Sequence, residues 1–267
     1  MTPPPSWDRG PERPVCDGGE IHVWRASLAV PPRELRRLAR MLSPDELERA
    51  ERFRFAEHRG DYLVARGLLR VILAGYLRVR PEAIRFRYGP WGKPAVDGEG
   101  GSGGLRFNLA HSHGVALFSV SRGRETGVDL ERIHPGVPSP RAAARWFPRQ
   151  EVARLRGLAG EAYAEGFLAC WARREAYLKA RGEGLTGLSA DPEGALGWGL
   201  HDLAPWPGYV GALAVEGTGY RIACWDLPVS LDRAERVRAR WSRDAQGLGG
   251  PSRGRAWEPP RSPRSPS

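Results

Sequence analysis

The sequence predicts an α/β protein, of the α+β kind, built from two similar halves. Helical patterns followed by strand patterns occur across residues 31–121, and the same order of elements returns across residues 139–226. A chain of 267 residues is long enough to bury one large core or two smaller ones. We therefore expect two α/β subdomains, over residues 20–125 and 126–230.

In the first half, a strand pattern over residues 20–30 precedes three helices. Residues 43–46 read Ser-Pro-Asp-Glu, a capping box that starts the second of these helices. An amphipathic helix is predicted over residues 61–77. It places Arg66 and Arg70 one turn apart, where they can hold an anion or form a solvated basic face.

The first half continues with short strands and polar turns. The strands are predicted at residues 84–88, 105–109 and 115–120. Residues 89–94 form a Gly- and Pro-rich turn that contains Lys93. Residues 110–114 form a tight polar turn, whose backbone N–H groups and side chains suit a phosphate.

The second half begins with a strand at residues 126–131 and then becomes helical. We predict helices at residues 140–147, 148–158 and 161–181, and strands at residues 209–215 and 220–226.

The two ends of the chain differ from these halves in composition. Residues 1–19 are rich in Pro and charge, and we expect them to be disordered. Residues 231–267 begin as an Arg-rich helix and end as a disordered Pro/Ser/Arg tail. The sequence has neither a signal-peptide pattern nor a membrane-length apolar run, so we expect a cytoplasmic protein with no membrane partner.

The formal charge of +10 indicates a polyanionic or acidic partner. Nucleic acid, a phosphate-rich cofactor and an acidic protein all satisfy this requirement. Only Lys93 and Lys179 are lysines among 41 basic residues, which indicates positions where arginine does not serve. The three cysteines are far apart and form no paired motif, which argues against a disulfide framework and a zinc site.

Asp129 and Glu131 form a pair of acids on one face of a predicted strand. Side chains alternate along a strand, so both carboxylates point the same way while Val128 and Leu130 point the other way. Two adjacent carboxylates repel unless a cation lies between them, and Mg²⁺ prefers oxygen ligands. The alternative is a solvated strand edge.

Glu175 interrupts the apolar stripe of the helix predicted at residues 161–181. A carboxylate in such a stripe must be paired, bound to a metal or neutralised. Lys179 lies one turn later, so a helix salt bridge between the two side chains is the structural alternative to a metal ligand.

Taken in order, these motifs resemble the 4′-phosphopantetheinyl transferases that activate peptide and polyketide synthetases. The resemblance covers about residues 20–228. It is carried by Ala65-Arg66-Gly67-Leu68-Leu69-Arg70, Gly92-Lys93-Pro94, Phe107-Asn108-Leu109-Ala110-His111-Ser112, Gly127-Val128-Asp129-Leu130-Glu131 and Trp171-Ala172-Arg173-Arg174-Glu175-Ala176-Tyr177-Leu178-Lys179.

The resemblance implies a pseudo-dimer of two α/β halves, with coenzyme A bound in the cleft between them. It implies Mg²⁺ ligands, a pyrophosphate partner and contacts for coenzyme A. The ligands are Asp129, Glu131 and Glu175; the pyrophosphate partner is Lys179; the contacts are Arg49, Arg66, Gly92, Lys93, Pro94 and His111. Glu175 and Lys179 are the implied catalytic residues. This chain departs from the family pattern at Ala110, where the family often has Ser, and at Arg174, where it has Lys.

The implied reaction moves phosphopantetheine from coenzyme A to a serine of an acyl or peptidyl carrier protein. Such carriers present an acidic helix, which a basic, monomeric enzyme would attract. Two alternatives stay open on the residues alone. A metal-dependent phosphohydrolase or nucleotidyl transferase could use the same three carboxylates, and a nucleic-acid-binding protein would explain the charge but not the buried acids.

Overall fold

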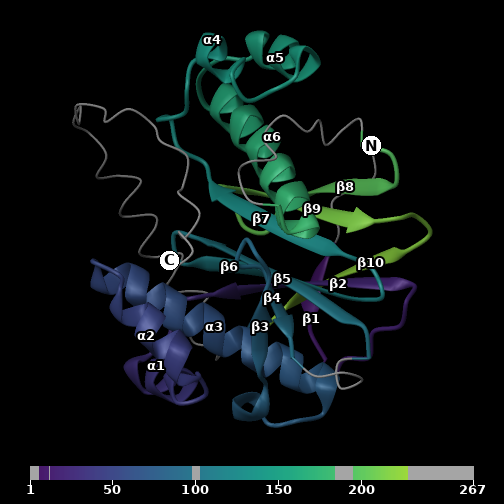
Figure 1. The fold of residues 1–267 in the computed structure, drawn as a ribbon. Helices are drawn as coiled ribbons and strands as arrows, with labels where there is room; N and C mark the ends of the chain where they lie inside the picture. Colours follow the sequence, from purple (N-terminus) through teal and green to yellow (C-terminus); the bar gives the residue numbers. More distant parts are fainter. Residues whose placement is uncertain (1–5, 12, 98–102, 184–194, 228–267) are drawn as a thin grey trace.

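The computed structural model describes residues 6–11, 13–97, 103–183 and 195–227 (Figure 1). Its strands form two main sheets and one small hairpin. The first sheet has the order β1-β10-β2-β6-β5, with β1 at Trp7–Arg9, β2 at Glu20–Ser27, β5 at Leu105–Ser112, β6 at Val115–Arg122 and β10 at Arg221–Asp226. The second has the order β7-β9-β8, with β7 at Thr126–Arg132, β8 at Trp198–Leu203 and β9 at Tyr209–Glu216. The hairpin pairs β3 at Phe86–Tyr88 with β4 at Pro94–Val96.

The helices fall into one group for each sheet. In the first half these are α1 at Pro32–Ala39, α2 at Pro44–Glu51, α3 at Ala56–Leu77 and a 3₁₀ turn at Pro81–Ala83; in the second they are α4 at Pro140–Ala143, α5 at Arg149–Arg156 and α6 at Gly160–Arg181. The predicted capping box at the start of α2 is present. No helix in the described ranges is long and apolar enough to cross a membrane.

The two sheets lie between the two long helices (Figure 1). One apolar core fills the space between α3 and the first sheet, and includes Leu69 and Phe118. A second core lies between the sheets and includes Leu117 and Val128. Alanines of α6 pack on alanines of β9 on the far side of the second sheet. This arrangement confirms the mixed α/β class and its two-part architecture.

The edge strands β5 and β7 bring the two sheets together. They share no backbone ladder, but the Val128 N–H donates to Asn108 Oδ1 over 3.0 Å. On its other face β7 approaches α6 closely at Gly127. A Cβ at Gly127 would lie 2.1 Å from the Ala176 carbonyl oxygen and 2.4 Å from the Ala180 nitrogen. Glycine here allows the strand and helix to touch, which sets the position of the acids that follow it.

The N-terminal segment departs from the expectation of disorder over residues 1–19. Residues Trp7–Arg9 form β1, which pairs in parallel with β10. Arg25 lies over the rings of Trp7 and Trp206, with its guanidinium carbon 4.7 Å from each ring centroid. The strand partner and the stacking partners are distant in sequence, so the local Pro-rich composition could not predict them.

The last described strand also crosses the expected boundary between the halves. β10 pairs in parallel with β2 and so belongs to the first sheet, although it follows the second sheet in sequence. The division into residues 20–125 and 126–230 stays a prediction, and β10 lies beyond its expected boundary while completing the first sheet. The predicted tail at residues 231–267 lies outside the described residues.

The turn between β5 and β6 is shorter than predicted. β5 runs on through His111 and Ser112, and Ser112 pairs with Val115. Only His113 and Gly114 form the loop, with φ angles of 44° and 80°. Two positive φ angles are typical of a type I′ hairpin, whose twist matches that of the flanking strands.

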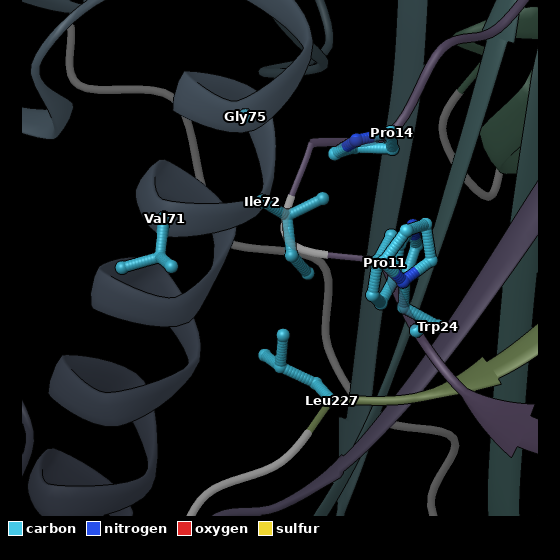
Figure 2. A pocket seen from close by; sticks show the side chains of 8 residues that line it. Pro11, Pro14, Trp24, Val71, Ile72, Gly75 and Leu227 are labelled. Carbon is cyan, nitrogen blue, oxygen red and sulfur yellow. The ribbon is translucent and has the colours of Figure 1, made fainter.

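An apolar cavity of about 290 Å³ lies between α3 and the N-terminal segment (Figure 2). Its walls include Trp24 of β2, Val71 and Ile72 of α3, and Leu227 at the end of the described chain. The described lining residues are apolar, glycine or proline.

Candidate functional site

The predicted acids meet where β7 lies against α6. Asp129 and Glu131 of β7 face the helix, because Val128 and Leu130 face the core between the sheets. Glu175 and Lys179 of α6 face the strand. Lys179 Nζ donates to Asp129 Oδ1 over 2.5 Å, and Asp129 is only 5% exposed. The fold thus joins residues that are 50 positions apart in sequence.

The cluster holds more negative charge than its own lysine neutralises. Burial, together with the Asp129 and Glu175 charges, raises the pKa of Glu131 to about 8. Burial and the Asp129 charge raise the pKa of Glu175 to about 7. Burial by itself would lower the pKa of Lys179, but the negative charges of the surrounding carboxylates have the larger effect and raise it. The arrangement therefore favours an added cation.

The helix salt bridge expected as the alternative for Glu175 does not form. Lys179 pairs with Asp129 across the strand and not with Glu175 on its own helix. Glu175 Oε1 and Asp129 Oδ2 are both buried and have no hydrogen-bond partner in the described part of the protein. Buried oxygens without partners are costly. They are suitable positions for a bound ligand.

The carboxylates of Asp129, Glu131 and Glu175 are chemically suitable ligands for a hard cation, although in this structure they are not arranged as a metal site. Three carboxylates with two unpartnered oxygens are the kind of ligands that Mg²⁺ takes. Among the residues that the structure describes, no three acidic, His or Cys side chains converge closely enough to hold a metal ion. The assignment of Asp129, Glu131 and Glu175 as Mg²⁺ ligands therefore stays a prediction.

The β5–β6 hairpin brings His111 and Ser112 to the same site. Ser112 Oγ lies 3.5 Å from Glu131 Oε2. His111 keeps surface exposed to solvent. Desolvation by the neighbouring protein atoms, together with the positive charge of Lys179, lowers the pKa of the imidazole. A neutral ring at this position can still donate a hydrogen bond to a phosphate oxygen.

The two arginines predicted to hold an anion already hold one. Glu46 of α2 is buried between them: its Oε1 lies 2.6 Å from Arg66 Nη2, and its Oε2 lies 2.7 Å from Arg70 Nη2. The alternative of a solvated basic face does not apply, because both arginines are buried. The Tyr88 hydroxyl accepts from Arg66 Nη2 over 3.1 Å, and the Arg66 guanidinium lies over the Phe86 ring. Its role toward coenzyme A stays a prediction.

Arg49 and the loop containing Gly92, Lys93 and Pro94 have different surroundings. Burial raises the pKa of Tyr62 to about 12, and the charges of Arg66 and Arg49 oppose the rise. Arg49 therefore lies close to the phenol of Tyr62. Lys93 Nζ donates to Glu125 Oε2 over 2.7 Å and to the Ala180 carbonyl at the end of α6.

Sequence reasoning missed several residues that support this site. Glu46 neutralises a buried arginine pair, Asn108 joins the two sheets, and Glu125 holds Lys93. The capping box indicated only the local role of Glu46. Asn108, a polar residue between Phe107 and Leu109, was the signal for the contact between sheets. Glu151, whose role the sequence left uncertain, is buried beside Arg173, 3.6 Å away.

Comparison with known proteins gives the same family for both halves. Residues 24–121 match the family model described as 4′-phosphopantetheinyl transferase, N-terminal, and residues 125–203 match that of the 4′-phosphopantetheinyl transferase superfamily. The 4′-phosphopantetheinyl transferase HetI of Nostoc sp. is 38% identical over 231 residues, which cover 82% of this chain and 98% of HetI. The 4′-phosphopantetheinyl transferase Sfp of Bacillus subtilis is 26% identical over 153 residues, which cover 57% of this chain and 66% of Sfp.

Proposed function

Because this chain belongs to the 4′-phosphopantetheinyl transferase superfamily, an enzyme family, we propose that it transfers 4′-phosphopantetheine from coenzyme A to a carrier-protein serine. The observation that carries the proposal is the cluster of Asp129, Glu131, Glu175 and Lys179, which combines excess carboxylate with one partly buried cation. Such a site suits a pyrophosphate bound together with a metal ion.

In the proposed reaction the serine oxygen attacks the β-phosphorus of coenzyme A. A new P–O bond forms, the bond to the bridging oxygen breaks, and adenosine 3′,5′-bisphosphate leaves. When bound by the three carboxylates, Mg²⁺ would neutralise charge on the pyrophosphate. Lys179 has further N–H groups beyond the one given to Asp129, and these can donate to phosphate oxygens. Glu175 Oε1 is the atom that we propose takes the serine proton.

The partner is proposed to be a carrier domain of a peptide, polyketide or fatty-acid synthase. The net charge of +10 supports an acidic partner, because charge complementarity raises the encounter rate. The matches over both halves favour transfer over the phosphohydrolase and nucleic-acid alternatives. A monomeric state and a cytoplasmic location stay predictions.

The test is to incubate the protein with an apo carrier protein, coenzyme A and MgCl₂, and to measure the mass of the carrier by mass spectrometry. We expect the carrier to gain one phosphopantetheine group, and a carrier whose target serine is replaced by alanine to gain none. Asp129→Asn should retain less than about a tenth of the activity, since several kcal/mol of transition-state stabilisation is lost. Asp202→Asn is the matched control, because Asp202 is exposed and paired with Arg173. Absence of any mass gain with several carriers would refute the proposal.

A further inference from the structure

The loop between β5 and β6 contains a residue in an unfavourable backbone conformation close to the proposed site. His113 has a φ angle of 44°, in the left-handed region that favours Gly, Asn or Asp. Its neighbour Gly114 has a φ angle of 80°. Because the loop is only two residues long, its conformation fixes where His111 and Ser112 lie at the end of β5.

Hydrogen bonds from outside the hairpin hold this loop. The hydroxyl of Tyr209 donates to the His113 carbonyl over 2.7 Å. The Leu28 N–H donates to the Gly114 carbonyl over 2.8 Å. Burial raises the pKa of the Asp61 carboxyl, and a hydrogen bond with the Gly114 backbone opposes that rise. Leu28 and Asp61 belong to the first half of the chain, whereas Tyr209 comes from the second.

Tyr209 links the position of the second sheet to that of the β5–β6 hairpin in the first sheet. It is 4% exposed, and its ring is part of the core between the sheets. On β9 it pairs with Arg132 of β7, the residue directly after Glu131. Its hydroxyl therefore connects the sheet that carries the acids to the hairpin that carries His111.

We propose that Tyr209 is a positioning residue, which fixes the His111–Ser112 end of β5 relative to the acid cluster and thereby sets the affinity for coenzyme A. The inference rests on the proposed function. Burial raises the pKa of the Tyr209 phenol, so the hydroxyl stays protonated and able to donate.

The test variant is Tyr209→Phe, which keeps the ring in the core and removes only the hydroxyl. We expect KM for coenzyme A to rise about fivefold, the effect of one lost hydrogen bond, with kcat and KM for the carrier protein unchanged. Calorimetry should show the same loss of affinity, and amide exchange at residues 112–115 should accelerate. Tyr163→Phe is the matched control, because its hydroxyl also donates to a backbone carbonyl, that of Pro138, over 2.5 Å.

A rescue variant separates positioning from general stability. His113→Asn places the residue that a type I′ loop prefers, so the hairpin needs less outside restraint. In the Tyr209→Phe background it should restore KM for coenzyme A to within about twofold of the wild type, because the loop regains its conformation without the hydrogen bond.

Unchanged affinity for coenzyme A in Tyr209→Phe would overturn the inference, even if exchange at the hairpin rises. A fall in kcat at constant KM, or an equal effect of Tyr163→Phe, would overturn it as well. A wild-type protein that transfers nothing refutes the proposed function instead. In that case the inference is decided by comparing the calorimetric affinity of the wild type and Tyr209→Phe for coenzyme A. A wild-type protein that binds no coenzyme A overturns the inference.

Discussion

Replacing Glu175 by glutamine removes a charge that the protein on its own does not balance. Glu175 Oε1 is buried without a hydrogen-bond partner in the described structure, and Lys179 is engaged by Asp129. Glutamine has nearly the same shape, so the packing of α6 should be retained. In the absence of metal and coenzyme A, the Glu175→Gln variant should be more stable than the wild type at pH 8.

The expected size follows from the pKa of this carboxyl. Its rise from 4.5 to about 7 corresponds to about 3 kcal/mol, at 1.36 kcal/mol for each pKa unit. Since the folded pKa is above the unfolded value, ionisation destabilises the fold; the cost is absent below pH 4.5, grows as pH rises and is complete above pH 7. The buried amide retains a cost of about 1 kcal/mol, which leaves a net gain of about 2 kcal/mol at pH 8.

Urea denaturation with EDTA at pH 5 and pH 8 measures this gain. We expect a stabilisation at pH 8 that vanishes or reverses at pH 5, with unchanged m-values. The matched control is Glu165→Gln, an exposed position on the same helix, which should show no such pH dependence. Added MgCl₂ and coenzyme A should stabilise the wild type more than Glu175→Gln. Equal destabilisation of the variant at both pH values would show that the carboxylate is satisfied within the protein, which would refute this prediction.

Two further predictions concern the frame around the site. Glu46→Gln should lower the free energy of unfolding by about 3–5 kcal/mol, because two buried arginines lose their counter-ion; the exposed Glu48→Gln should change it by less than about 0.5 kcal/mol. Equal effects in urea melts would contradict the buried pair. Gly127→Ala should push β7 from α6 and cost more than about 2 kcal/mol, whereas Gly60→Ala, with space around it, should not destabilise α3.

Some features of the site could be predicted because they depend on short-range patterns. The alternation of β7 placed Asp129 and Glu131 on one face, as the structure shows. The stripe of α6 singled out Glu175, and the structure leaves its Oε1 buried without a hydrogen-bond partner in the described residues. Each pattern depends only on residues that are close in sequence: alternate residues along one strand, or residues three or four positions apart along one helix.

Other features required contacts that no local pattern contains. The sequence offered Arg66 and Arg70 to an external anion, but the structure fills that place with Glu46, 20 residues before Arg66. The sequence also suggested a salt bridge between Lys179 and Glu175, but in the structure Lys179 forms its ion pair with Asp129 on β7. Which charge neutralises which depends on the packing of distant elements, because a buried charge takes the partner that the fold places nearest.

The sequence by itself determined the two long helices and most of the strands, although not β1, β4 or β8. It also determined the cap of α2, the acid face of β7 and the family resemblance, all of which rest on periodicity and motif order. Only the tertiary structure decided that β10 returns to the first sheet beside β1, that Asn108 joins the two sheets, and that Tyr209 reaches the hairpin of the opposite sheet. Strand pairing and contacts between sheets are long-range choices, made by burial and by the hydrogen bonds of edge strands, and local sequence carries little information about them.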